Sequence, residues 1–302
     1  MLRPESPSPS RTRPQGPGRR GLRLREHRVL LVDYATQYVL AAFARHDGWV
    51  SDERDYPQSA AQRGRIEPAP RRVRGYLGHE LVFDTTAARY VWEVPYYPQY
   101  YIPLADVRTE FLRDENHSQK VQFGSSRLHS LVGPGQEHEM AARVFDDGPV
   151  AGLVRFEWGR LRWLEEDEPI YGHPRNPYVR VDALRSHRRV RVELEGTVLA
   201  DTAAPVLLFE TGLPTRYYID RSDVAFEHLE PSDTQTLCPY KGTTSEYWSV
   251  RVGDSLHQDL AWTYHYPLPA VATIAGLVAF YNEKLDMVVD GVALARPNTK
   301  FS

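Results

Sequence analysis

"RRVRGYLGHELVFDTTAARYVWEVPYYPQYYIPLADV", residues 71–107, and "RRVRVELEGTVLADTAAPVLLFETGLPTRYYIDRSDV", residues 188–224, are two versions of one pattern. They align without a gap, and the same Arg-Arg-Val-Arg start, the same tyrosine pair and the same Asp-Val end recur in both. Glu93 falls opposite Glu210, each at the end of an apolar run. Chance does not place so many features in one order, so the chain is predicted to repeat a folding unit.

A second block supports the repeat. "AGLVRF" at Ala151 matches "AGLVAF" at Ala275 after a short difference in length. The two ordered matches predict a tandem duplication, with one copy at residues 71–182 and the other at residues 183–302. Each copy has roughly a hundred residues, which is enough for a core of its own.

The repeated unit is predicted to be mostly β. "VRVELEGTVLADT" alternates Val190, Val192 and Leu194 with charged residues, and Glu195-Gly196 provides the turn, so this segment is a β-hairpin. "VLLFE" is a short apolar run of the kind found in buried strands. "RYYI", "EYWSVRV" and "DLAWTYHY" are rich in aromatic and β-branched residues, which favour strands.

The start of the chain has a different composition. Residues 1–28 are rich in proline, arginine, serine and glycine and nearly lack apolar side chains, so a disordered tail is predicted. Residues 29–70 are predicted to hold a short helix, from apolar residues at helical spacing, and then a polar linker with several prolines.

Composition excludes several classes of function. A net charge of -3 gives no basic face for nucleic acid, and no apolar run is long enough to span a membrane. The single cysteine rules out an intrachain disulfide and a paired-cysteine zinc site, and it fits a cytoplasmic protein. No histidine spacing typical of a metal site and no glycine-rich nucleotide loop appears, so neither a metal nor a cofactor is expected.

"TLCPYKGTTSEYW", residues 236–248, holds the candidate chemistry. Cys238 is a potential nucleophile because Lys241 can favour its thiolate, and the lysine itself can attack a carbonyl or bind an anion. Glu210 is a candidate general base or partner of the lysine. Each residue also has a structural interpretation. Cys238 could be a small buried thiol and Lys241 a solvated lysine in a turn. Glu210 could belong to a structural salt bridge.

Aromatic residues are predicted to surround these groups. Strand alternation lets only one of Tyr217 and Tyr218 face the site, and Tyr218 is the candidate. The candidate ligand-binding residues are Tyr218, Tyr240, Tyr247, Trp248, Trp262 and Tyr264.

Alignment of the copies places the site in the second one. In the ungapped register Cys238 falls opposite Val121, and Lys241 falls opposite Gly124. The first copy is therefore expected to keep the apolar shape but to lose both the thiol and the ammonium.

Three stretches, "LFETGLPTRYYI", "TLCPYKGTTSEYWSV" and "AWTYHYPLPAVATIAGLVAFY", resemble the domain family DUF427, and the first copy resembles a diverged member. The resemblance covers residues 71–302, and its most specific part is the Cys-Pro-Tyr-Lys-Gly block. It implies a β-tent fold, in which two antiparallel sheets meet at an angle over a pocket. The family lacks an agreed activity, so the fold implies a cavity and not a reaction.

Three functions follow as hypotheses. The first is binding of a small molecule, with an anionic group as one option, in an aromatic-lined pocket of the second copy. The second is an enzyme that uses Lys241 or Cys238 as nucleophile and Glu210 as base. The third is a non-catalytic interaction scaffold.

Overall fold

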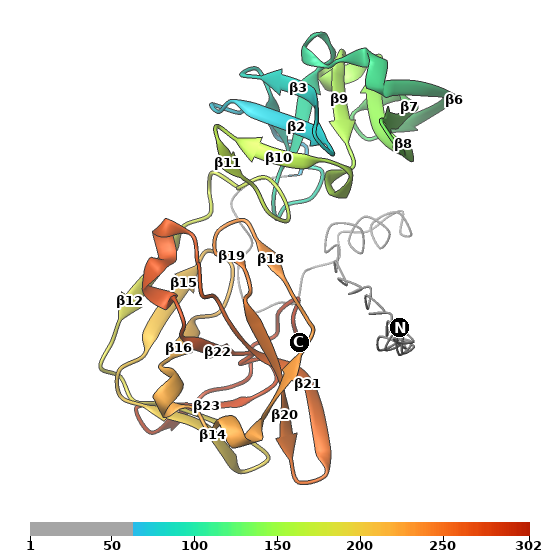
Figure 1. The fold of residues 1–302 in the computed structure, drawn as a ribbon. Helices are drawn as coiled ribbons and strands as arrows, with labels where there is room; N and C mark the ends of the chain where they lie inside the picture. The colour runs from blue at the N-terminus through green and yellow to red at the C-terminus, as the bar shows by residue number, and fades with distance from the viewer. Residues whose placement is uncertain (1–62) are drawn as a thin grey trace, which may run out of the picture.

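The structure is a computed structural model that describes residues 63–302. Figure 1 shows two β-rich bodies that follow one another along the chain. Every pair of strands in their sheets is antiparallel. The predicted tandem, mostly β architecture is confirmed. The tail predicted for residues 1–28 and the short helix predicted after it lie outside the described residues.

The first copy contains two sheets. The larger has seven strands in the spatial order β1 (Ile66–Pro68), β4 (Arg89–Val91), β5 (Gln99–Pro103), β9 (Leu153–Phe156), β8 (Gln136–Phe145), β7 (Gly124–Gly133) and β6 (Leu112–Val121). The smaller has four strands in the order β11 (Glu168–Pro169), β10 (Arg162–Glu165), β2 (Val73–Leu77) and β3 (Glu80–Thr85).

The second copy repeats this arrangement. Its seven-stranded sheet has the order β12 (Val181–Arg185), β15 (Val206–Glu210), β16 (Arg216–Ile219), β22 (Val278–Phe280), β21 (Ser255–Thr263), β20 (Glu246–Val252) and β17 (Leu229–Ser232). Its four-stranded sheet has the order β14 (Thr197–Thr202), β13 (Val190–Leu194), β23 (Asp286–Val289) and β24 (Val292–Ala293). A small extra hairpin joins β18 (Leu237–Cys238) to β19 (Gly242–Thr243).

Short 3-10 helices connect the strands: η1 (Leu104–Asp106), η2 (Thr109–Phe111), η3 (Gly148–Val150), η4 (Trp158–Arg160), η5 (Arg221–Asp223), η6 (Phe226–His228) and η7 (Pro269–Ile274). The last of these fills the place where the sequence allows one helical turn before β22. Within residues 63–302, no helix has the length and apolar character needed to cross a membrane.

The end of the predicted linker belongs to the first sheet. Ile66–Pro68 forms the edge strand β1 and pairs with β4, although residues 29–70 were predicted to be helix and linker. In the second copy β12 occupies the same edge position. A three-residue strand with a proline has too little pattern to be recognised alone, and only pairing with its neighbour defines it. The other predicted boundaries remain predictions.

Alternation of side chains divides the large sheet of the second copy into two faces. Tyr217 and Trp248 pack between the two sheets, in a core that includes Val190. Tyr218 and Trp262 pack on the opposite face, in a separate cluster that η7 helps to cover. The choice of Tyr218 over its neighbour follows from this division, because one residue along a strand reverses the direction of the side chain.

The two cores fill one position in complementary ways. In the first copy Gly75 lies opposite Phe83, and a Cβ on the glycine would come within 2.2 Å of the phenylalanine ring. In the second copy the equivalent cross-strand pair is Val192 and Ala200. One copy combines no side chain with a large ring, and the other combines two side chains of moderate size. Close packing requires this kind of compensation.

We therefore expect the effects of Gly75→Val and Phe83→Ala on the unfolding free energy to be strongly non-additive. The first overfills the core and costs about 1–3 kcal/mol of unfolding free energy, and the second leaves a cavity and costs about 3–5 kcal/mol. The double variant recreates the pair of the second copy, so its loss should be smaller than the sum of the two. Urea unfolding of the four proteins measures this coupling. Additive losses would contradict the packing argument.

Candidate functional site

Glu210 and Lys241, which the sequence put forward together, meet in the structure. Glu210 is the last residue of β15, and Lys241 belongs to the turn between β18 and β19. The Lys241 Nζ forms an ion pair with Glu210 Oε2, and the two side chains are only 12% and 9% exposed. A pair this buried has lost most of its hydration, so each charge depends on the other for compensation.

Cys238 lies at the base of the same turn. It pairs with Gly242 across the hairpin, and Gly242 has a φ of 100°, a conformation that side chains strongly disfavour. The tight turn that results brings Cys238 and Lys241 onto one small element. The thiol is half-buried, unpaired and near enough to interact electrostatically with the ammonium.

The charge of Lys241 is fixed by its surroundings. Burial by itself lowers the pKa of a lysine, but attraction by Cys238, Glu210 and Tyr218, with the hydrogen bond to Glu210, outweighs it and raises the pKa of Lys241 above its ordinary value. The side chain therefore stays an ammonium at neutral pH. An ammonium can bind an acceptor or an anion, but it cannot act as a nucleophile.

Tyr218 contributes a polar group without a partner. The residue is fully buried, and its hydroxyl oxygen has no hydrogen-bond partner in the described part of the chain. The Trp262 indole lies near enough to lower the pKa of this phenol but not in a geometry that makes a standard hydrogen bond. Burial dominates and raises the pKa of Tyr218 to about 12, so the phenol stays protonated. A buried hydroxyl without a partner costs about 1–3 kcal/mol of unfolding free energy.

Aromatic rings surround this hydroxyl. Tyr218 and Trp262 lie on either side of Ala279 in the sheet. Tyr247 stacks on Trp262 with ring centroids 6.1 Å apart, and Tyr281 lies 4.5 Å from the same indole. The hydroxyls of Tyr247 and Tyr281 are hydrogen-bonded at 2.7 Å. Four of the rings thus belong to one continuous cluster on the site face.

The other sequence candidates divide between the faces. Tyr264 is buried in the same cluster, and burial raises its pKa. Tyr240 lies in the turn beside the lysine, and burial raises its pKa as well. Trp248 lies on the opposite face, where it packs edge-on against Phe226 with ring centroids 5.7 Å apart. Alternation along β20 separates Trp248 from the site, so it is a core residue and does not line the predicted pocket.

The first copy has its own version of the ion pair. Glu93, the counterpart of Glu210, accepts hydrogen bonds from the Tyr101 hydroxyl at 3.0 Å and from Arg155 Nε at 3.1 Å. Arg155 is 7% exposed, and the attraction of its carboxylate partners raises its pKa despite burial, which opposes the shift. The alignment of the turns predicts the loss of the thiol and the ammonium in the first copy, but it could not reveal the guanidinium that Arg155 supplies from β9.

Position in the sheet explains the exchange. Arg155 lies opposite Tyr101, as Ala279 lies opposite Tyr218 in the second copy. On the next strand Arg143 lies opposite Arg155, where the second copy has Trp262. Two guanidinium groups therefore occupy the space that an alanine and an indole define in the second copy. The first copy fills the site with its own charges, whereas the second surrounds it with rings.

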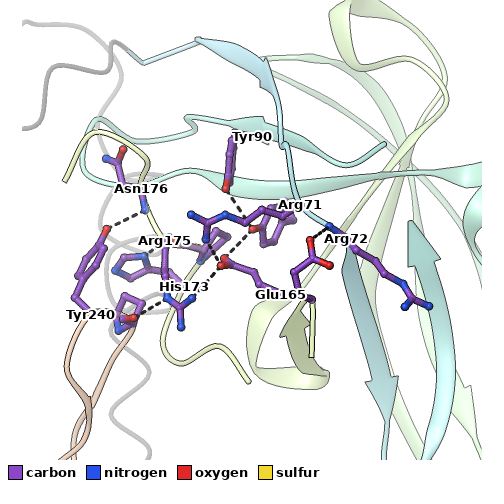
Figure 2. A network of polar contacts seen from close by, with 12 residues as sticks. Arg71, Arg72, Tyr90, Glu165, His173, Arg175, Asn176 and Tyr240 are labelled. Carbon is purple, nitrogen blue, oxygen red and sulfur yellow. Dashed lines mark hydrogen bonds and ion pairs between the residues drawn. The ribbon is translucent and has the colours of Figure 1, made fainter. Parts of the chain in front are cut away.

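A polar network that the sequence did not reveal joins the two copies (Figure 2). Its centre is Glu165, which is 3% exposed and accepts a hydrogen bond from the Tyr100 hydroxyl at 2.8 Å. Arg71 and Arg175 both form ion pairs with this carboxylate. Arg175 also donates from Nε to the carbonyl oxygen of Pro239 at 3.0 Å. Arg175 lies in the segment between β11 and β12, residues 170–180, which is called the linker from here on. It thus connects the first copy to the turn that carries the candidate site.

His173 lies in the same linker. Its ring stacks on Tyr97 with centroids 4.0 Å apart and meets the edge of Tyr240 at 6.2 Å. Its Nδ1 lies 2.8 Å from the carbonyl oxygen of Pro174. The backbone N–H of Asn176 donates to the Tyr240 hydroxyl at 2.9 Å. Figure 2 shows these linker residues next to Tyr240.

The imidazole of His173 is neutral at pH 7. Removal from water lowers its pKa to about 4; the hydrogen bond to Pro174 and the charge of Glu210 oppose this shift, and the charge of Lys300 adds to it. Sequence reasoning missed this histidine, because it lacks the spacing of metal ligands and its neighbours in the fold are distant in sequence.

Two consecutive bodies, each with a seven-stranded and a four-stranded antiparallel sheet in the same order, define a tandem-repeat β protein with one buried lysine–glutamate site in its second copy. The chain matches the family described as "Domain of unknown function (DUF427)" over residues 65–161 and 182–291. It therefore belongs to this family and carries two copies of the domain. No curated protein matches the chain.

Removal of the buried ammonium should destabilise the protein. We expect Lys241→Met to lower the unfolding free energy by about 3–5 kcal/mol at pH 7, because Glu210 is left buried without its cation. Lys120→Met, at an exposed strand position, is the matched control and should change it by less than about 0.5 kcal/mol. Urea unfolding compares the two. Equal losses of unfolding free energy in the two variants would contradict the argument that Glu210 needs the ammonium of Lys241 because both are buried.

The protonation of His173 predicts a pH dependence. The folded pKa lies below the unfolded value, so its contribution to stability is complete above about pH 6.5 and is lost as the pH falls toward about 4. We expect the difference in unfolding free energy between the wild type and His173→Gln to decrease across this range. The exposed His187→Gln should follow the wild type. A difference that stays constant with pH would contradict the neutral, buried imidazole.

Proposed function

We propose that the second copy binds a small planar molecule on its aromatic face, between the Lys241–Glu210 pair and the ring cluster. The observation that carries the proposal is the Tyr218 hydroxyl, which is buried without a hydrogen-bond partner among the described residues. A protein tolerates the cost of such a group where a ligand or a reaction uses it. The surrounding rings provide flat apolar walls, as in most small-molecule sites.

The polar groups suggest which ligand features are recognised. Lys241 donates to an acceptor or an anionic group, and Glu210 accepts from a donor. Because the two charges cancel, a ligand with an anionic group has to share the ammonium with Glu210. A planar heteroaromatic carboxylate combines a ring for the aromatic face with such a group. The lone unpaired cysteine supports a cytoplasmic location for this binding protein.

The enzyme hypothesis retains one of its two nucleophiles. The raised pKa of Lys241 disfavours its amine as a nucleophile, whereas the Cys238 thiol lies on the same turn as this ammonium. An enzyme of this kind would use Cys238 as nucleophile and would need Glu210 to release its lysine before acting as a base. The interaction-scaffold hypothesis makes no use of these buried groups. Ligand binding, by contrast, uses Lys241 as an ammonium and Tyr218 as a protonated phenol, the states that their surroundings favour.

A conservative pair of variants tests the proposed function. Tyr218→Phe removes only the unpartnered hydroxyl, so we expect the free protein to become equally or more stable. Tyr101→Phe, at the equivalent position of the first copy, removes the hydrogen bond to Glu93 and should cost about 0.5–1.5 kcal/mol or more. Thermal unfolding of both variants without ligand measures this contrast.

The same variants are then compared in binding. Planar heteroaromatic carboxylates and their carboxamides, such as nicotinate and nicotinamide, are the probes in a thermal-shift screen. A compound that stabilises the wild type should bind about tenfold more weakly to Tyr218→Phe and with unchanged affinity to Tyr101→Phe. Full affinity in Tyr218→Phe, or the absence of any stabilising compound, would contradict the proposal.

A further inference from the structure

We infer that the linker and the first copy build one side of the ligand site proposed above for the second copy. The ring of His173, held flat on Tyr97, forms a wall beside Tyr240. The inference rests on the proposed function because it assumes a ligand, but the position of the wall does not depend on that function. It gives the first copy a role, because a residue of the first copy then helps to determine which ligands the second copy accepts.

The linker backbone lies directly on the hairpin that carries the site. Gly172 has a φ of +72°, and a Cβ on it would lie 3.4 Å from the carbonyl oxygen of Leu237 and 3.7 Å from Cδ of Pro239. These two residues flank Cys238. The linker therefore contacts the chain on both sides of the thiol, within the turn that also positions Lys241.

Hydrogen bonds fix the linker to both copies. Asn176 donates from its backbone to the Tyr240 hydroxyl of the second copy and from Nδ2 to the carbonyl oxygen of Tyr96 in the first, at 2.9 and 3.0 Å. Arg175 bridges Glu165 of the first copy and Pro239 of the second. The linker is therefore hydrogen-bonded to the first copy and to the turn of the second copy, and it holds the two in a defined position.

His173 brings defined chemistry to this wall. A carbonyl oxygen only accepts, so Nδ1 carries the proton that bonds to Pro174, and Nε2 of the neutral ring is an acceptor. The charged groups that act on the ring are Glu210 and Lys300, and its packed neighbours are the phenols of Tyr97 and Tyr240. The wall therefore adds an acceptor and not a second cation. It favours a ligand with a hydrogen-bond donor on that side.

The supporting ring is a specialisation of the first copy. Tyr97 lies between β4 and β5, and in the ungapped alignment of the two copies it falls opposite Pro214. The second copy thus has no ring at the equivalent position. The two copies differ where one of them has to contact the other, as expected if the first copy completes the site of the second.

Alkylation of Cys238, the only cysteine, tests the wall in the full-length chain without any ligand. We expect His173→Ala and Tyr97→Ala each to raise the rate of iodoacetamide labelling about tenfold, because the thiol becomes more accessible. His173→Phe keeps a flat ring and should label at the wild-type rate. Tyr178→Ala is the matched control, since this linker ring contacts Glu67 and Trp92 of the first copy instead of the hairpin.

Unchanged labelling in His173→Ala and Tyr97→Ala would overturn the inference, as would an equal increase in Tyr178→Ala, which would indicate general loosening. A binding measurement separates the chemistry from the shape. Any probe that stabilises the wild type should bind His173→Phe more weakly, since the wall remains but its acceptor is gone. If no probe binds at all, the proposed function fails while the labelling result still decides whether the wall exists.

Discussion

The buried pair of Lys241 and Glu210 is the constraint on which the candidate site depends. Two opposite charges that have left water are tolerable only while they stay in contact, and the aromatic neighbours that exclude water also strengthen their attraction. The turn that carries the lysine must therefore hold its place against the end of β15. The tight Gly242 turn and the linker contacts at Pro239 and Tyr240 both serve this positioning.

The duplication shows two electrostatic solutions on one scaffold. Both copies bury a carboxylate at the same point, but the first neutralises it with Arg155 from within the sheet, and the second with a lysine from an added turn. At this position of the sheet the first copy has an arginine, whereas the second copy has Ala279 beside the rings. Among residues 63–302 the Tyr101 hydroxyl has a hydrogen-bond partner and the Tyr218 hydroxyl has none, a difference that fits the ligand-binding role proposed for the second copy alone.

The contact between the copies contains a buried and fully hydrogen-bonded polar network. Glu165 is almost fully buried and bonded by two arginines and a tyrosine, and such a network is costly unless every member is satisfied. One of those arginines continues to the turn of the second copy. A duplicated domain that only needed to be linked would not require this arrangement. The junction instead couples the position of the first copy to the shape of the candidate site.

The sequence by itself determined the repeat and the antiparallel β class, since these depend on local alternation, turn residues and the comparison of the two copies. It selected Glu210, Cys238 and Lys241 as candidates, and the tertiary structure decided that Lys241 and Glu210 meet. Alternation along a strand predicted that only one of Tyr217 and Tyr218 faces the site, yet it did not place Trp248 on the core face, because the register of β20 is set by its partners. Only the tertiary structure decided that Arg155 pairs with Glu93 in the first copy and that His173 packs against Tyr97 and Tyr240. Both come from segments distant in sequence, and no local pattern records which side chains a folded sheet and a docked linker bring into contact.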